Sequence, residues 1–234
     1  MIAREATDRV ALSLFDCGAF KDKTHPTAIE RNGEHGFLLK RHEKHPDDPL
    51  SPFYMNLRTS DNSNPGPLGR DLINQCVGLM RILAGYYGFS YERVCGLPHA
   101  GEPFAEAYCW LDHKDYRPTG ILTLNKQQSE GKRQIVGPPS GNFLPRDRVL
   151  VIDDLITEAH SKLEGIKVLE EAGLVVKDVL VMLDRRQGGA FELQKRGYQL
   201  HAVFTLEELL GIYHRHNRIS GELHAEILAY VHAN

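Results

Sequence analysis

The chain has 234 residues, of which 41% are hydrophobic and 25% are charged, a composition typical of a globular domain. A net charge of -3 gives no reason to expect affinity for nucleic acid, and no apolar run approaches the ~20 residues that a membrane-spanning helix needs. The four cysteines are widely spaced without a CxxC pair, which argues against a structural zinc site and favours a reducing cytoplasm.

The first part of the chain predicts short elements separated by polar insertions. Residues 5–19 carry apolar side chains at helical spacing and predict a helix. Residues 21–35 are polar and predict an irregular insertion or a short arm. Segments 37–41 and 52–60 indicate short strands on either side of a charged, proline-broken loop.

From residue 68 onward, helices and strands alternate regularly. A long helix is predicted at 68–88, followed by strands at 93–97, 120–126, 148–154, 175–183 and 198–204, helices at 102–113, 161–172 and 189–197, and two closing helices at 205–215 and 220–233. Residues 127–142 predict a polar loop with room for one short strand pair. Because the strands are almost continuously apolar, this order predicts an α/β fold with a mainly parallel sheet covered by helices on both faces.

Two adjacent acidic residues, Asp153 and Asp154, follow the apolar strand VLVI. Ligands of open parallel sheets bind beyond the carboxyl ends of the strands, and the next helix N-terminus suits an anion. A sugar pyrophosphate with Mg²⁺, or the hydroxyls of a ribose, would satisfy the two carboxylates; a purely structural pair that caps the loop and helix is the alternative. A phosphoacceptor receiver domain is disfavoured, because there the acidic pair lies near the start of the domain.

The motif VLVIDDLIT, with the helix after it, resembles the phosphoribosyl pyrophosphate (PRPP) motif of type I phosphoribosyltransferases. Five further segments resemble the orotate branch of that family, especially the form fused to orotidylate decarboxylase. They are ALSLFDCGAFK, GFLLKR, SPFYMNLR, VCGLPHAGEPFAEA and VLVMLDRRQGGAFELQKRGYQLHAVFTLEELL. The match leaves out insertions near 21–35, 41–49 and 59–66. It implies the type I fold, with an N-terminal helix and hood at 1–66 and a core with C-terminal helices at 67–234, together one compact domain.

The resemblance implies transfer of a phosphoribosyl group from PRPP to orotate in UMP synthesis, with Mg²⁺ and a homodimer whose mobile loop acts across the two-fold axis. It assigns Asp153 and Asp154 to the ribose hydroxyls and, mostly through the substrate, to the metal. The remaining implied site residues are Lys126 and Lys132 in the mobile loop and Lys40, Phe53, Tyr54, His99, Thr157, His160, Ser161 and Arg185 around the substrate. Core packing is the alternative for Phe53 and Tyr54, and a surface salt bridge is the alternative for Arg185.

The chain departs from the family pattern on the phosphate side. The loop TEAHS lacks the usual glycine and carries Glu158, and two unit charges ~4 Å apart repel by about 4 kcal/mol at an effective dielectric constant of ~20. Ser129 stands where a second lysine is expected, and His99 and Ala100 replace a tyrosine and often a lysine. Three hypotheses therefore stay open: an orotate-type transferase, a catalytically impaired module that binds a base or nucleotide, and a transferase for another ribosyl substrate.

Overall fold

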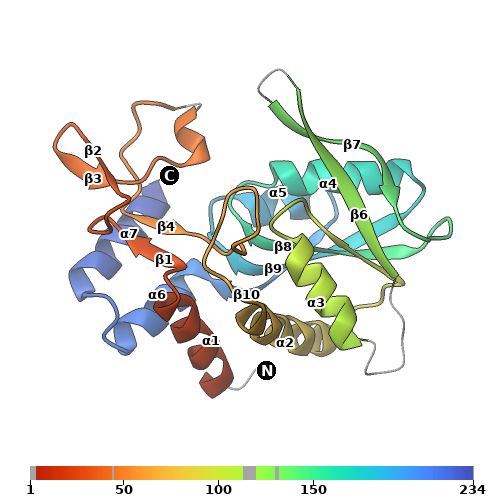
Figure 1. Ribbon diagram of the computed structural model, residues 1–234, viewed down its shortest axis with the longest axis horizontal. Coiled ribbons are helices and arrows are strands. Elements are labelled where there is room, and N and C mark those ends of the chain that lie inside the picture. The colour runs from red at the N-terminus through yellow and green to blue at the C-terminus, as the bar shows by residue number, and fades with distance from the viewer. Residues whose placement is uncertain (1–3, 44, 113–119, 130–131, 234) are drawn as a thin grey trace.

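The computed structural model describes residues 4–43, 45–112, 120–129 and 132–233, and it joins an N-terminal hood to a helix-covered sheet (Figure 1). The sheet consists of β5 (Arg93–Gly96), β6 (Gly120–Ser129), β7 (Lys132–Ser140), β8 (Arg148–Ile156), β9 (Val175–Asp184) and β10 (Gln199–Thr205). Its strand order is β10-β9-β8-β5-β6-β7, and every neighbouring pair is parallel except β6 and β7. The predicted α/β fold with a mainly parallel sheet is confirmed.

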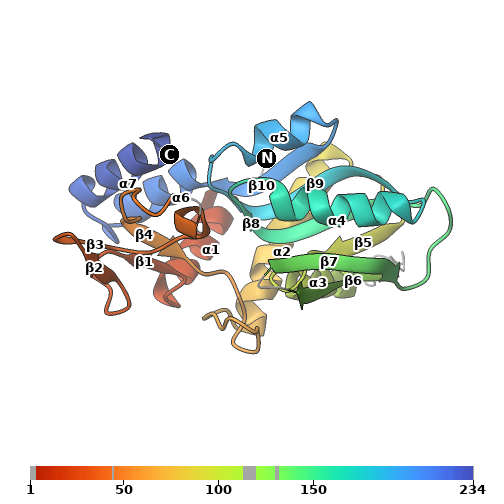
Figure 2. The same ribbon diagram turned by 90° about the horizontal axis from the view of Figure 1, so that it is seen from above.

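Helices cover both faces of this sheet (Figure 2). On one side lie α2 (Arg70–Tyr87) and α3 (Glu102–Asp112), and on the other lie α4 (His160–Glu171) and α5 (Gly189–Lys195). The alternation along β8 explains this arrangement, because Leu150 and Ile152 belong to the buried cluster that contains α2, whereas Val149 and Val151 pack with Ile166 of α4. None of the described helices has the length and apolar character needed to cross a bilayer.

The hood packs against the C-terminal helices. It contains α1 (Arg4–Asp16), β1 (Phe20–Asp22), β2 (Ile29–Arg31), β3 (Glu34–Gly36), the 3-10 helix η1 (Lys40–Glu43) and β4 (Phe53–Met55), beside α6 (Leu206–Arg215) and α7 (Gly221–Ala233). Aromatic rings hold the two parts together: the Phe20 ring centroid lies 5.4 Å from that of Tyr213 in α6 and 6.3 Å from that of Phe53 in β4.

Of the two alternatives for 21–35, an irregular insertion or a short arm, the structure favours the arm, since β2 and β3 form an antiparallel hairpin whose turn, Asn32–Gly33, has φ angles of 55° and 82°. The strand predicted at 37–41 is wrong: only Phe37 bridges, to Ser51, and a 3-10 turn follows. The buried His42 ring stabilises that turn, because its Nδ1 lies 2.9 Å from the Leu39 amide nitrogen.

The segment at 127–142, predicted as a polar loop with room for one short strand pair, belongs to a long antiparallel ribbon. The pairing of β6 with β7 includes Lys126 opposite Ile135 and Gln127 opposite Gln134. Ile135 is buried, and its N–H donates to the Glu164 carboxylate of α4 at 2.8 Å. Cross-strand hydrogen bonds satisfy this polar backbone, so the ribbon forms without the alternating apolar pattern from which strands are predicted.

Candidate functional site

The acidic pair and the loop after β5 meet where the order of the sheet reverses. β5 lies between β6 and β8, so the carboxyl ends of β5 and β8 border the switch point at which open α/β sheets bind ligands. The Leu97 N–H donates to the Ile152 carbonyl at 2.9 Å. A Cβ atom on Gly101 would lie 2.4 Å from that carbonyl oxygen and 3.0 Å from Cα of Asp153, so glycine permits the loop to lie against the acidic pair.

The two aspartates of this pair are buried but have different partners. Each is only 6% exposed. The Lys162 ammonium of α4 lies 2.7 Å from Oδ2 of Asp153 and donates to the Leu155 carbonyl at 2.6 Å. Burial and the neighbouring charge of Asp153 raise the pKa of Asp154 to about 7, against the opposing charges of Lys162 and the hood residue Arg58.

Arg185 comes directly after β9 and faces the hood. Its backbone N–H donates to the Ile156 carbonyl at 3.0 Å, and its guanidinium carbon lies 4.7 Å from the centre of the Phe53 ring. The side chain is 5% exposed, and its Nε and Nη2 atoms have no hydrogen-bond partner among the described residues. Burial lowers its pKa to about 10. The guanidinium is buried and forms no ion pair with a carboxylate of the described residues, so Arg185 is not in a surface salt bridge.

Phe53 and Tyr54 present different surfaces to this region. Phe53 is fully buried in the core, as the packing alternative required, yet it also supplies the ring beneath Arg185. Tyr54 is half-buried, its ring lies 5.8 Å from that of Phe37, and its hydroxyl accepts a hydrogen bond from Arg58 Nη1 at 3.2 Å. The hood therefore presents an aromatic and cationic surface to the ends of β8 and β9.

The TEAHS loop, residues 157–161, has an ordinary backbone. Ala159 has φ -83° and ψ 0°, so the conformation does not require a glycine there. Glu158 is exposed, with its carboxylate 3.4 Å from His160 Nε2, and Ser161 is half-buried. No side chain caps the N-terminus of α4, and the Thr157 carbonyl accepts a hydrogen bond from the Gly189 N–H at 2.9 Å. The loop thus keeps a helix N-terminus that no side chain covers, with an acidic residue beside it.

On the side of the β5 loop, Lys126 of β6 donates from Nζ to the Pro98 carbonyl at 3.2 Å. His99 Nδ1 lies 3.3 Å from the Glu102 carboxylate at the start of α3. The side chains of Lys40, Ser129 and Lys132 lie outside the described part of the structure, so their predicted roles stay predictions.

Sequence reasoning did not place Arg58 or Lys162 among the site residues. Arg58 lies within the strand predicted at 52–60, which also carries Phe53 and Tyr54, so a cation close to them in sequence was a usable signal. Lys162 is buried and turned toward Asp153 rather than outward. Its position in a helix carries no pattern that points to a residue of the preceding strand.

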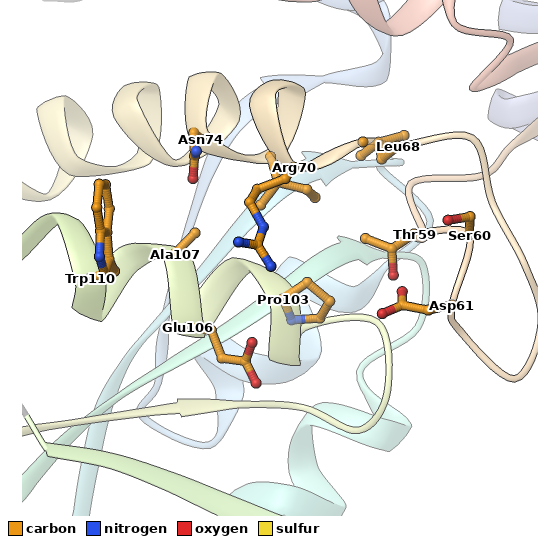
Figure 3. A pocket seen from close by; sticks show the side chains of 12 residues that line it. Thr59, Ser60, Asp61, Leu68, Arg70, Asn74, Pro103, Glu106, Ala107 and Trp110 are labelled. Atoms are coloured by element: carbon orange, nitrogen blue, oxygen red, sulfur yellow. The ribbon is translucent and has the colours of Figure 1, made fainter.

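A cavity of about 650 Å³ lies elsewhere, between α2, α3 and the turn at 59–61 (Figure 3). Arg70 and Asn74 of α2 face Glu106 and Trp110 of α3 across it. None of the predicted site residues lines this cavity. Its lining mixes acidic, basic and apolar side chains without a convergent set of groups. We therefore place the candidate site at the ends of β5, β8 and β9, where the reactive side chains converge.

Comparison with known proteins agrees with the resemblance seen in the sequence, although no family model matches the chain. A uridine 5'-monophosphate synthase from Bos taurus is 28% identical over 185 residues, which are 79% of this chain and 36% of that protein. An orotate phosphoribosyltransferase from Aquifex aeolicus is 33% identical over 124 residues, which are 52% of this chain and 66% of that protein.

Among solved structures, the UMP synthase of Leishmania donovani superposes with a TM-score of 0.69 at 23% identity, covering 98% of this chain and 43% of that one. The matched residues make up 36%, 33% and 30% of the first three curated relatives, so the chain spans about a third of their length. In sequence and in fold, the chain belongs to the type I phosphoribosyltransferases, as a relative of the orotate phosphoribosyltransferases.

Proposed function

We propose that the chain transfers a phosphoribosyl group from PRPP to orotate in pyrimidine nucleotide synthesis, giving orotidylate and pyrophosphate. The observation that carries this proposal is Arg185, a buried guanidinium next to the ring of Phe53 whose donor atoms Nε and Nη2 have no hydrogen-bond partner in the described part of the chain. Buried donors of this kind leave an energetic deficit that a bound ligand can remove. The planar fork of a guanidinium matches a carboxylate or the oxygen edge of a pyrimidine, and orotate has both.

The other residues would act on the sugar and the leaving group. Asp154 would accept hydrogen bonds from ribose hydroxyls, and the positive charge of the hood residue Arg58 favours its ionised form. Lys126, held at the loop after β5, would place positive charge beside the pyrophosphate. The N-glycosidic bond forms between N1 of orotate and C1 of the ribose as the bond from C1 to pyrophosphate breaks. The departing pyrophosphate keeps the electron pair of that bond, and its oxygens can take up the proton that N1 loses.

The residues present fit Mg²⁺ only as an ion held mostly by the substrate. No three ligating side chains converge anywhere in the described residues, and Asp153 is already paired with Lys162. Mg²⁺ in nucleotide sites is often held by one or two carboxylates together with substrate phosphates, and Asp154 could supply such a carboxylate. When bound, the ion would neutralise charge on the pyrophosphate.

A second function, binding a base or nucleotide with little turnover, is favoured by the phosphate loop. The Glu158 carboxylate sits beside the N-terminus of α4, where a ribose 5-phosphate would bind. The His160 ring lies 3.4 Å from this carboxylate, and Ala159 adopts a backbone that leaves the helix N-terminus open. We therefore propose weak PRPP binding and slow turnover rather than loss of the site.

We also propose that the chain acts as a homodimer in a reducing cytoplasm. α2 exposes Ile82, Tyr86 and Tyr87, and α3 exposes Trp110, and these large apolar side chains lie on two helices of the same sheet face, where a second copy of the chain could bury them. No disulfide joins the four cysteines, which suits but does not require a reducing compartment.

The proposal is tested by titrating orotate into the wild type and two arginine variants in a calorimeter. Hydrogen bonds to charged groups contribute ~1.5–3 kcal/mol, so Arg185→Ala should weaken orotate binding about ten- to a hundredfold. Arg186→Ala removes the exposed neighbouring guanidinium and should change the affinity little. If the wild type does not bind orotate at millimolar concentration, or if both variants bind equally well, the pyrimidine assignment is wrong.

A further inference from the structure

We propose that Lys162 is a positioning residue that holds Asp153 in an internal ion pair and thereby leaves Asp154 as the carboxylate that receives the ligand's hydroxyl groups. This inference rests on the proposed function and divides the work of the acidic pair between its two members. It differs from the expectation, drawn from the resemblance, that both aspartates contact the ribose.

The position of Lys162 is unusual for a lysine. Its side chain is buried and lies in the first turn of α4, where the helix dipole disfavours a cation and where no acidic residue compensates. Burying an ammonium costs free energy unless it is paired and hydrogen-bonded. Here the pairing is provided by Asp153 Oδ2 at 2.7 Å and by the Leu155 carbonyl at 2.6 Å. Lys162 is therefore fixed by the end of β8 rather than by its own helix.

Asp153 has both carboxylate oxygens engaged within the protein. Oδ2 receives Lys162, and Oδ1 accepts a hydrogen bond from the Asp154 N–H at 2.9 Å. A ligand hydroxyl could reach Asp153 only by displacing a buried ammonium, which would leave an uncompensated charge in the interior. A neutral hydroxyl gives too weak an interaction to replace that ion pair.

Asp154 is left with capacity for a ligand. Its Oδ1 accepts a hydrogen bond from the Leu155 N–H at 2.7 Å, and its Oδ2 receives no hydrogen bond from the described residues. Successive side chains of a strand point to opposite sides, so Asp154 points away from the side on which Lys162 holds Asp153. The positive charge of the hood residue Arg58 favours the ionised form of Asp154, and Arg58 also donates a hydrogen bond to the Tyr54 hydroxyl beside the proposed base site.

The test is a double-variant cycle read out by calorimetric binding of orotidylate, which contains the ribose, and of orotate, which does not. Lys162→Met should weaken orotidylate binding at least about tenfold, because two adjacent carboxylates without a countercharge repel and shift, while orotate affinity changes little. Adding Asp153→Asn removes that repulsion and should return orotidylate affinity to within about threefold of the wild type. Asp154→Asn should lose at least about tenfold.

Lys167→Met, which removes an exposed lysine of the same helix, is the matched control and should bind like the wild type. If Lys162→Met does not fold, the double variant Asp153→Asn with Lys162→Met, which lacks both charges, is compared directly with Asp154→Asn. A double variant that binds orotidylate as poorly as Asp154→Asn would overturn the inference while leaving the proposed function intact. Absence of orotidylate binding by the wild type would overturn both.

Discussion

Burial gives Asp154 an acid strength unlike that of a surface aspartate. Its pKa is about 7 in the folded protein, against 3.8 for the ordinary side chain. The folded state therefore holds the proton more tightly than the unfolded state, and the resulting stabilisation is fully present below about pH 4 and lost as the pH rises through 7. Hydroxyl binding by the ionised carboxylate follows the opposite trend, so stability and ligand affinity should diverge across this range.

We predict that the free energy of unfolding of the ligand-free wild type falls between about pH 4 and 7 more steeply than that of Asp154→Asn. The reason is that the variant lacks the titrating group while keeping nearly the same shape. Urea unfolding at several pH values measures both proteins, and the other titrating groups are common to the two. Parallel pH profiles would show that Asp154 does not titrate in this window.

The site shows which single residues a sequence can identify. Asp153, Asp154 and Arg185 lie in motifs whose spacing could be recognised, and the structure brings their elements together at one edge of the sheet. Whether Arg185 was a surface residue could not be decided, because its burial depends on Phe53, more than a hundred residues away in sequence. Lys162 could not be assigned either, because its contact with Asp153 depends on how α4 turns back over the end of β8.

Among the elements, the loop between β5 and α3 depends most directly on one glycine. We predict that Gly101→Ala lowers the free energy of unfolding by more than ~2 kcal/mol and abolishes PRPP binding, because its Cβ would overlap the Ile152 carbonyl at 2.4 Å. Gly211→Ala, in the interior of α6 with only Arg215 within 4 Å, should instead be neutral or stabilise by about 0.5–1 kcal/mol. Chemical unfolding measures both, and an equal response of the two variants would contradict the proposed close approach.

Prediction of the elements succeeded where apolar patterning was strong and failed where backbone pairing decided the outcome. The strands β8, β9 and β10 and the long helix α2 were identifiable from buried periodic residues. The ribbon of β6 and β7 and the 3-10 turn at η1 are stabilised by cross-strand hydrogen bonds and by the buried His42 ring, neither of which produces a hydrophobic period.

For the whole molecule, the exposed apolar faces of α2 and α3 bear on assembly. We predict that the protein is a dimer at micromolar concentration and that Ile82→Asp weakens dimerisation at least about tenfold, because it places a charge in a desolvated contact. Ile82 is 49% exposed in the single chain. Phe191→Asp on α5 is the matched control, since Phe191 is 67% exposed but lies on the other face of the sheet. Sedimentation velocity decides: a monomeric wild type, or equal effects of both variants, would contradict the interface.

The arrangement of the hood against the core was expected only from the resemblance. Aromatic contacts of Phe15 and Phe20 with Tyr213 of α6 hold the first and last parts of the chain together, and no local pattern in the sequence specifies that pairing. In the proposed function, the base side of the site, with Tyr54 and Arg58, would therefore come from the hood, whereas the sugar side would come from β8.

The central claim is that the ends of β5, β8 and β9 transfer a phosphoribosyl group to orotate, and the most direct measurement is orotidylate formation from orotate and PRPP with Mg²⁺. We predict slow orotidylate formation by the wild type and none by Asp154→Asn. A variant with Glu158→Ser, Ala159→Gly and His160→Thr should form orotidylate faster than the wild type when PRPP is subsaturating, because the acidic side chain next to the helix N-terminus is removed. No orotidylate from either the wild type or the loop variant, at any PRPP concentration, would contradict the account.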